Sequence, residues 1–299
     1  MDRLITKVRG MEGFLRCRDL PRICRVTDMK HPSLWTVASA TRQSSQPRGL
    51  ILNTFEYLEG PILSLIRTNI NPNTYTIGPL HELLKTKLES ATRPPSGDLR
   101  KANRGCLKWL DDQPPRSVIY VSFGSLALTK TDQVMEFWHG LVNSKRRFLW
   151  VRRPGSNPDS DSASDGVIPG ELLRGTKERG KIVEWAPQEE VLAHRAVGGF
   201  LTHSGWNSTL ESIAAGVPML CWPYFYDQQV NSAYVDRVWG IGLDMKDVCD
   251  RSVVEKMVDD LMGERQEELL RSASKMSELA RKSSSEGDSS FCNLERLVQ

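Results

Sequence analysis

The stretch THSGWNSTLES, residues 202–212, holds a histidine, a tryptophan, an asparagine and several hydroxyl side chains in a short span of chain. Asn207 and Ser208 could donate hydrogen bonds to phosphate oxygens, and His203 could add a further donor. Gly205 would let the main chain approach a ligand closely. These residue types at this spacing make the stretch a candidate phosphate-binding cradle.

A second interpretation of the same stretch needs no ligand. Ser208 and Glu211 have the spacing of a capping box, in which the first and fourth residues of a helix start bond each other's main-chain N–H groups. Helices use this arrangement at their N-termini with no ligand at all. Taken alone, the stretch leaves a ligand site and a plain helix start as open alternatives.

Short apolar runs around this stretch predict buried strands, and helical patterns alternate with them. The strand candidates are SVIYVSF (117–123), FLWV (148–151), KIVEW (181–185), GGFLT (198–202) and PMLCW (218–222). TDQVMEFWHGLV (131–142) and PQEEVLAH (187–194) predict helices, the second with Pro187 at its first helical position. This alternation predicts an α/β fold with a doubly wound parallel sheet.

The sheet determines where the cradle would lie. GGFLT is the strand, HSGWNS the turn, and STLESIAAG (208–216) the helix, which Gly216 would close. In doubly wound sheets, ligands bind outside the carboxyl ends of the strands, where helix N-termini direct N–H groups at anions. The candidate cradle is therefore expected at that edge.

Composition and charge exclude several classes of protein. Lys and Arg number 40 and Asp and Glu 37, with the signs interspersed, so no basic surface for nucleic acid is expected. No apolar run approaches the roughly 20 residues that span a bilayer, and MDRLITKVRG lacks the apolar core of a signal peptide. The scattered cysteines suggest neither a disulfide framework nor a zinc site. We expect a cytoplasmic monomer.

The chain is predicted to contain two parts. Residues 1–93 have the strand GLILNTF (49–55), the helix EYLEGPILSLIRTN (56–69) and the strand TYTIGP (74–79). The Pro- and Gly-bearing stretch 88–103 predicts a connection to the second part, 94–299. That part ends in amphipathic stretches at about 251–263 and 265–282. A polar loop, 153–166, carries Asp159 and Asp161, to which we assign no metal.

The stretch 185–228, WAPQEEVLAHRAVGGFLTHSGWNSTLESIAAGVPMLCWPYFYDQ, closely resembles the donor-binding signature of plant UDP-dependent glycosyltransferases. The matching motifs are WAPQ, HSGWNS, ES, GVPM and the final DQ. Neither a G-x-G-x-x-G fingerprint nor a Walker P-loop is present, which disfavours dehydrogenases and kinases. The resemblance implies a GT-B fold of two facing Rossmann-like domains. The C-terminal domain would be complete and the N-terminal domain truncated.

The resemblance also implies a role for each matching residue. Trp185 would stack on uracil, Ala186 would meet the uracil edge through its main chain, and Gln188 would donate to the nucleoside. Glu211 would accept from the ribose hydroxyls. The residues expected at the diphosphate are His203, Asn207, Ser208 and Ser125, the last from SFGS. Those expected at the sugar are Trp206, Asp227 and Gln228, and a final glutamine in this signature is associated with glucose.

The reaction that the resemblance implies is inverting transfer of glucose from UDP-glucose to a hydroxyl or carboxyl of a small metabolite, with no further cofactor. In the resembling enzymes, the base is a histidine oriented by an aspartate, both expected upstream of this chain. The five histidines present (His31, His81, His139, His194 and His203) do not match its context. The alternative function is UDP-sugar binding without catalysis.

Two further stretches carry weaker expectations. RGMEGFLRCRDLPRICR (9–25) resembles enzymes that glucosylate iridoid acids such as 7-deoxyloganetic acid. The C-terminal SSFCNLERLVQ (289–299) is expected to pack back across the N-terminal part, as it would in a two-domain transferase.

Overall fold

Six parallel strands form the main sheet of the computed structural model, which describes residues 2–89, 104–124, 130–152, 179–246 and 248–298. Their order across the sheet is β5 (Gly180–Val183), β4 (Arg147–Val151), β3 (Val118–Ser122), β6 (Val197–Thr202), β7 (Met219–Cys221) and β8 (Gly242–Asp244). The chain builds outward from β3 to β5, then returns beside β3 and builds outward from β6 to β8. This is the doubly wound order predicted from the sequence.

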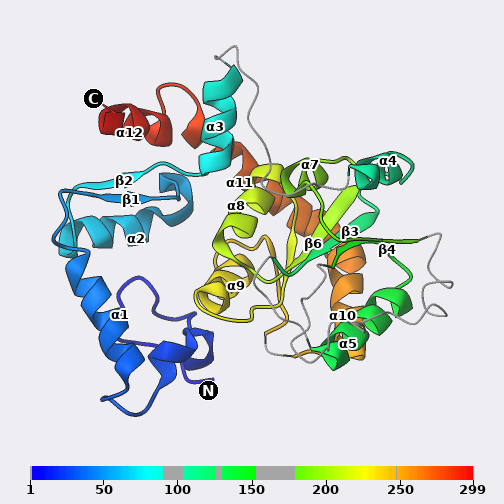
Figure 1. Cartoon of the computed structure of the whole chain (residues 1–299), viewed down its shortest axis with the longest axis horizontal. Helices are drawn as coiled ribbons and strands as arrows, with labels where there is room; N and C mark the ends of the chain where they lie inside the picture. The colour runs from blue at the N-terminus through cyan, green and yellow to red at the C-terminus, as the bar shows by residue number, and fades with distance from the viewer. Residues whose placement is uncertain (1, 90–103, 125–129, 153–178, 247, 299) are drawn as a thin grey trace.

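Successive strand residues point to opposite faces of the sheet, and both faces are buried under apolar clusters. On β3, Tyr120 belongs to one apolar cluster, and Ile119 and Val121 belong to the other. Helices α5 (Thr131–Asn143) and α10 (Arg251–Asp259) cover the second cluster, and they lie together in Figure 1. The opposite face is covered by α4 (Gly105–Asp111), α7 (Gln188–Leu192), α8 (Trp206–Ala215) and α11 (Gln266–Ser284).

All five predicted strands of this sheet are confirmed, with two differences. The run KIVEW was expected to be a strand through Trp185, but β5 ends at Val183 and Trp185 lies in the following loop. Strand β8 was not predicted. It has only three residues, follows two residues after Gly240 and ends on Asp244, so it has no apolar run long enough to recognise.

The start of α8 differs from the prediction in a way that matters for the site. The helix begins at Trp206 with Gly205 at its N-cap, so Ser208 lies inside the first turn and does not cap the helix. The capping-box interpretation is therefore wrong. The predicted helix end is confirmed, because Gly216 adopts φ 70° and its N–H bonds to the carbonyl of Ile213. Pro187 is the N-cap of α7 and not its first helical residue.

The N-terminal part contains a small parallel sheet of β1 (Leu50–Leu52) and β2 (Thr74–Thr76), joined by α2 (Glu56–Asn69) as predicted. Two elements flank this unit, α1 (Pro32–Gln43) before it and α3 (Leu80–Glu89) after it. In Figure 1 this part lies to the left of the main sheet.

The first residues of the chain contact α9 (Gln228–Arg237), a helix of the main-sheet part. Arg237 donates to Asp19 Oδ2 at 2.6 Å and to the main-chain oxygen of Phe14 at 2.8 Å. The Phe14 ring meets Tyr234 edge-on, with centroids 4.9 Å apart. The side chains of Asp19 and Arg237 are 5% and 18% exposed, so this is a buried ion pair.

The C-terminal helix α12 (Ser289–Val298) packs against β2 beside α3, as Figure 1 shows. Ser290 Oγ donates to the carbonyl of Gly78 at 2.6 Å, and Asn293 Nδ2 donates to the carbonyl of Thr76 at 3.0 Å. The expectation that the C-terminal stretch packs back across the N-terminal part is confirmed.

Several sequence expectations fall outside the described residues. They are Ser125, the loop 153–166 with Asp159 and Asp161, most of the predicted connection 88–103, and the boundary between residues 93 and 94. Within the described ranges, no helix combines the length and apolarity needed to cross a bilayer. The same residues contain no group of three or more His, Cys, Asp and Glu side chains placed to hold a metal ion.

Candidate functional site

The carboxyl ends of β3 and β6 form the point of the main sheet at which the strand order reverses. The two strands are neighbours, and Phe123–Gly124 follow β3 as His203–Gly205 follow β6. Ligand sites of doubly wound folds occur at such a switch point, because loops diverge there and leave a crevice. The candidate cradle predicted from the sequence lies here.

His203 is held between two glycines of these turns. A Cβ atom at Gly124 would lie 2.6 Å from the imidazole, and one at Gly205 would come closer still. Gly124 also has φ +77°, which other residues rarely adopt. Burial lowers the pKa of His203 to about 4, although the nearby Asp227 carboxylate opposes this shift. The imidazole is therefore neutral at pH 7 and can offer one N–H donor.

The turn after β6 is fastened to α9 through a residue that the sequence analysis missed. Ser204 adopts a left-handed φ of 62°, and its carbonyl accepts a 2.9 Å hydrogen bond from Asn231 Nδ2. The same amide group donates to Asp227 Oδ2 at 2.8 Å. No local sequence signal marks Asn231, because α9 is polar in sequence and only the structure shows that it is largely buried. Asn231 thus links the turn after β6 to the residues expected at the sugar.

Gln188 is the first residue of α7, and its side chain connects this helix with α8. Its Nε2 lies 2.9 Å from Ser208 Oγ and 2.5 Å from Glu211 Oε2. Its Oε1 accepts a 3.2 Å hydrogen bond from the hydroxyl of Tyr120. The structure therefore brings together Gln188, Ser208 and Glu211, which the sequence analysis assigned to the nucleoside and the diphosphate.

Glu211 is a buried carboxyl group at this edge. Burial raises its pKa to about 7, while the hydrogen bond from Gln188 lowers it and the neighbouring Glu189 raises it further. Near neutral pH the group is therefore divided between an acceptor-only carboxylate and a protonated form. An ionised Glu211 can accept from vicinal hydroxyl groups such as those of a ribose.

Trp185 and Ala186 lie in the loop between β5 and α7, at the same end of the sheet. The Trp185 side chain is half-buried, and Ala186 is 5% exposed. An indole with an exposed part offers a flat apolar surface for a base, and the adjacent main chain offers hydrogen-bonding groups. These positions are compatible with the roles expected from the resemblance.

Trp206 and Asn207 lie at the start of α8 and contact the N-terminal part. Trp206 Nε1 donates to the main-chain oxygen of Asn53 at 2.7 Å, so its indole N–H is engaged within the protein. Asn53 Nδ2 lies 3.4 Å from Asn207 Oδ1. That contact uses the oxygen of the exposed Asn207 amide and leaves its Nδ2 group for an acceptor such as phosphate.

Asp227 and Gln228 begin α9, where the sequence analysis placed the sugar. Asp227 is exposed and is the N-cap residue of the helix. Gln228 is 4% exposed, and its Oε1 accepts from the N–H groups of Tyr224 and Phe225 at 2.8 and 2.9 Å. These bonds orient the amide, and its Nε2 group remains to donate to a ligand hydroxyl.

The histidines outside this turn belong to other parts of the fold. His31 caps α1 by accepting from the N–H of Ser33, and His139 lies within α5. His194 Nε2 lies 3.1 Å from Asp111 Oδ1, but this pair precedes β6 and β3 and so lies at the amino ends of the strands. His81 lies 3.7 Å from Glu82 at the start of α3.

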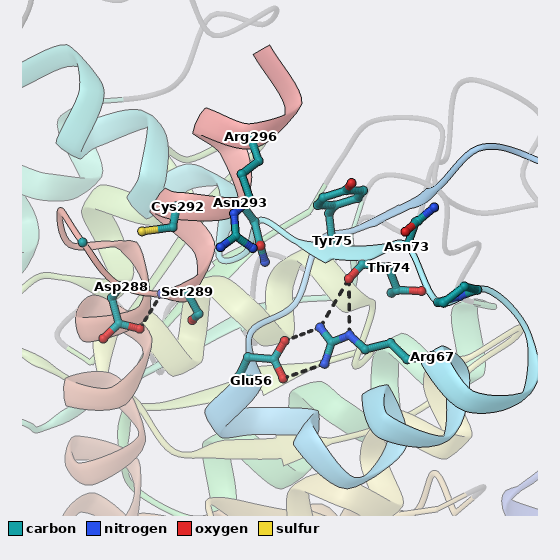
Figure 2. A pocket seen from close by; sticks show the side chains of 12 residues that line it. Glu56, Arg67, Asn73, Thr74, Tyr75, Asp288, Ser289, Cys292, Asn293 and Arg296 are labelled. Atoms are coloured by element: carbon teal, nitrogen blue, oxygen red, sulfur yellow. Dashed lines mark hydrogen bonds and ion pairs between the residues drawn. The ribbon is translucent and has the colours of Figure 1, made fainter. Parts of the chain in front are cut away.

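A cavity of about 510 Å³ lies apart from this edge, between α2, β2 and α12 (Figure 2). Its charged groups are largely bonded to the protein. Figure 2 shows Arg67 directed at the Glu56 carboxylate, with which it forms a two-pronged ion pair, and at the carbonyl of Thr74. We interpret the side chains that line this cavity as a cover over β2, because they occupy main-chain carbonyls of that strand.

Comparison with known proteins is consistent with this geometry. The family model described as "UDP-glucoronosyl and UDP-glucosyl transferase" matches residues 99–274. A 7-deoxyloganetic acid glucosyltransferase of Catharanthus roseus is 56% identical over all of this chain and 62% of its own length. A myricetin 3-O-rhamnoside 1,2-glucosyltransferase of Crocosmia x crocosmiiflora is 46% identical over the whole chain and 61% of its own length. The chain thus spans less than two thirds of these relatives.

Solved structures give the same result. Os79 from O. sativa, in complex with UDP, has a TM-score of 0.83 at 31% identity, covering 95% of this chain and 62% of that one. UGT2 of Phytolacca americana, complexed with UDP-2fluoro-glucose and pterostilbene, has a TM-score of 0.81 at 30% identity, over 95% of this chain and 61% of its own. These similarities confirm the expected GT-B fold class. Because the family model spans more than half of the residues, the chain belongs to the UDP-glucoronosyl and UDP-glucosyl transferase family.

Proposed function

We propose that this chain binds UDP-glucose at the carboxyl edge of its main sheet and contributes the donor side of an inverting glucosyltransferase. The observation that carries this proposal is the convergence of the turn after β6, Gln188 and Glu211 at the switch point of the sheet. Uracil would stack on Trp185, with the main chain of Ala186 at its edge. Glu211 would accept from the ribose.

The diphosphate would lie over the turn after β6. His203, Ser208 and Asn207 are neutral donors there, and the first turn of α8 adds main-chain N–H groups with their partial positive charge. Negative charge grows on the β-phosphate as the bond to glucose breaks. Fixed donors aimed at that charge stabilise the transition state more than the ground state, which lowers the barrier.

The sugar would lie toward the start of α9. The carboxylate of Asp227 and the Nε2 group of Gln228 are the groups proposed to bond its hydroxyls. The acceptor is proposed to be an iridoid acid, because the 56% identical relative is a 7-deoxyloganetic acid glucosyltransferase. The acceptor oxygen would attack the anomeric carbon from the side opposite to UDP, giving inversion.

The first test is UDP binding to the 299-residue chain by isothermal titration calorimetry. Trp185→Ala is expected to make the free energy of UDP binding less favourable by about 1–3 kcal/mol, the usual contribution of base stacking on an aromatic side chain. Trp35→Ala is the matched control, because Trp35 lies on α1 and is 59% exposed. Equal affinities of wild type and Trp185→Ala would contradict the uracil assignment.

The second test supplies UDP-glucose and 7-deoxyloganetic acid and measures the glucoside by mass spectrometry. Product formation that Glu211→Ala greatly reduces would support transfer at this site. Tight UDP binding without any product would contradict transfer by this chain and favour nucleotide-sugar binding alone. Absence of UDP binding would contradict the donor site itself.

A further inference from the structure

Tyr120 lies beneath the candidate donor site, on β3 at the centre of the main sheet. The side chain is 1% exposed, and its ring stacks on Phe200 with centroids 5.0 Å apart. The hydroxyl points toward α7 and lies 3.2 Å from Gln188 Oε1. A buried central strand is among the most rigid places in a fold, so the Tyr120 hydroxyl is held in a fixed position next to Gln188.

The hydrogen-bond partners determine which way the Gln188 amide faces. The Gln188 atom 2.5 Å from Glu211 Oε2 is the amide nitrogen, and the ionised form of Glu211, which has no hydrogen to donate, requires this orientation. The amide oxygen then faces Tyr120, and the phenol must be the donor. Burial raises the pKa of Tyr120 far above neutral, so its proton is present at pH 7.

This orientation decides what Ser208 and Glu211 can offer to a ligand. Gln188 has two amide hydrogens, and the geometry gives one to Ser208 Oγ and the other to Glu211 Oε2. Because Ser208 accepts from Gln188, its own hydroxyl hydrogen is left for an acceptor such as a phosphate oxygen. Glu211 keeps its second oxygen for a hydroxyl donor. A flipped amide would instead place its oxygen against the Glu211 carboxylate and repel it.

We propose that Tyr120 is a positioning residue for nucleoside diphosphate binding, which acts by holding the Gln188 amide in the orientation that presents Ser208 as a donor and Glu211 as an acceptor. The proposal rests on the proposed function for its ligand. It goes beyond that function because it assigns the orientation of the site's donors and acceptors to a residue of the central strand, below all the residues expected to touch UDP.

A double-mutant cycle with UDP as the ligand tests the proposal. Tyr120→Phe removes only the hydroxyl and keeps the stack on Phe200. It is expected to weaken UDP binding roughly 2- to 12-fold, the equivalent of one hydrogen bond. In a Gln188→Ala background the same substitution is expected to change the affinity no further, because the residue through which Tyr120 acts is gone. Equal losses in both backgrounds would overturn the proposal.

A measurement without ligand keeps the proposal separate from the proposed function. The hydrogen bond from Gln188 lowers the pKa of Glu211, so a loosened amide should move that pKa upward. Carboxyl ¹³C NMR of Glu211 follows the titration in wild type and in Tyr120→Phe. Tyr234→Phe is the matched control, because its buried hydroxyl has no hydrogen-bond partner among the described residues.

The outcomes are distinct. If wild type fails to bind UDP, the proposed function fails, and the Glu211 titration alone decides the role of Tyr120. An upward shift in Tyr120→Phe, absent from Tyr234→Phe, supports the proposal. An unchanged Glu211 titration in Tyr120→Phe overturns it, as does UDP affinity equal to that of wild type.

Discussion

The indole Nε1 of Trp206 donates a 2.7 Å hydrogen bond to the main-chain oxygen of Asn53, 153 residues earlier in the sequence. Asn53 follows β1 and Trp206 opens α8, so the bond joins the carboxyl ends of the two sheets. The side chain of Asn53 accepts from the N–H of Leu80 at 3.0 Å, which directs its amide nitrogen toward Asn207. The residue that follows β1 thus positions the first turn of α8, the helix beneath the proposed diphosphate.

Removing this link should destabilise the chain. Trp206→Phe keeps an aromatic ring but leaves the carbonyl of Asn53 without its donor. We expect it to lower the free energy of unfolding by about 1–2 kcal/mol more than Trp239→Phe does. Trp239 is the matched control, since its Nε1 is buried without a partner among the described residues. Equal losses in urea unfolding would show that the Asn53 bond adds nothing.

Gly205 is expected to be intolerant of even one added carbon. Its φ of −61° suits any residue, so strain cannot explain an effect of Gly205→Ala, whereas the new Cβ would overlap the His203 ring. Overpacking of this kind costs about 1–3 kcal/mol. We expect lower stability in urea unfolding and weaker UDP binding by calorimetry. Gly60→Ala, where a Cβ meets nothing within 4 Å, should show neither change.

Glu211 should make stability depend on pH. Its pKa is raised from 4.5 to about 7 in the folded chain, so between those values the folded state binds more protons than the unfolded state. The contribution of Glu211 to stability is therefore present below pH 4.5 and is lost as the pH rises through 7. Relative to wild type, Glu211→Gln should gain stability from pH 5 to pH 8, on the order of 3 kcal/mol. Parallel unfolding free energies for the two proteins would contradict this.

The ion pair between Asp19 and Arg237 should stabilise the attachment of the N-terminal residues to α9. Asp19→Asn leaves a largely buried guanidinium without its closest carboxylate, and breaking such pairs costs about 3–5 kcal/mol. Glu190→Gln removes one partner of the exposed Arg104–Glu190 pair and should cost at most about 1 kcal/mol. Chemical unfolding of both variants compares the two losses directly. Similar losses would mean that burial does not strengthen the Asp19 pair.

Much of the main sheet could be predicted because its strands are short, apolar and separated by recognisable turns. Burial of both faces leaves β3 and β6 without polar interruptions, and the αL glycine at 216 marks the end of α8. The position of the candidate cradle followed from the order of strand, turn and helix. The elements that were missed carry weaker patterns, such as the three-residue β8 and the polar helix α9.

The bonds within the site could not be predicted from spacing. Ser208 and Glu211 stand three residues apart in either interpretation. The structure excludes the capping box because α8 begins at Trp206, and it brings Gln188 to both side chains from a different helix. Nothing local to Asn231 or Tyr120 reveals that each supports a turn or side chain at the sheet edge. Such contacts depend on where distant elements pack, and a sequence pattern describes only one element at a time.

The cover over β2 has a consequence for how this protein meets other chains. In the parallel pairing of β1 and β2, the carbonyls of Thr74 and Thr76 point away from β1, and they are occupied by Arg67 and Asn293. A strand of another chain that approached from that side would find these two carbonyls already hydrogen-bonded. Leu50 and Leu52 bond the chain of β2, so the main-chain groups of Ile51 between them face away from β2, and Ile51 is 57% exposed. Strand addition, and any aggregation that begins with it, would therefore proceed from the β1 side.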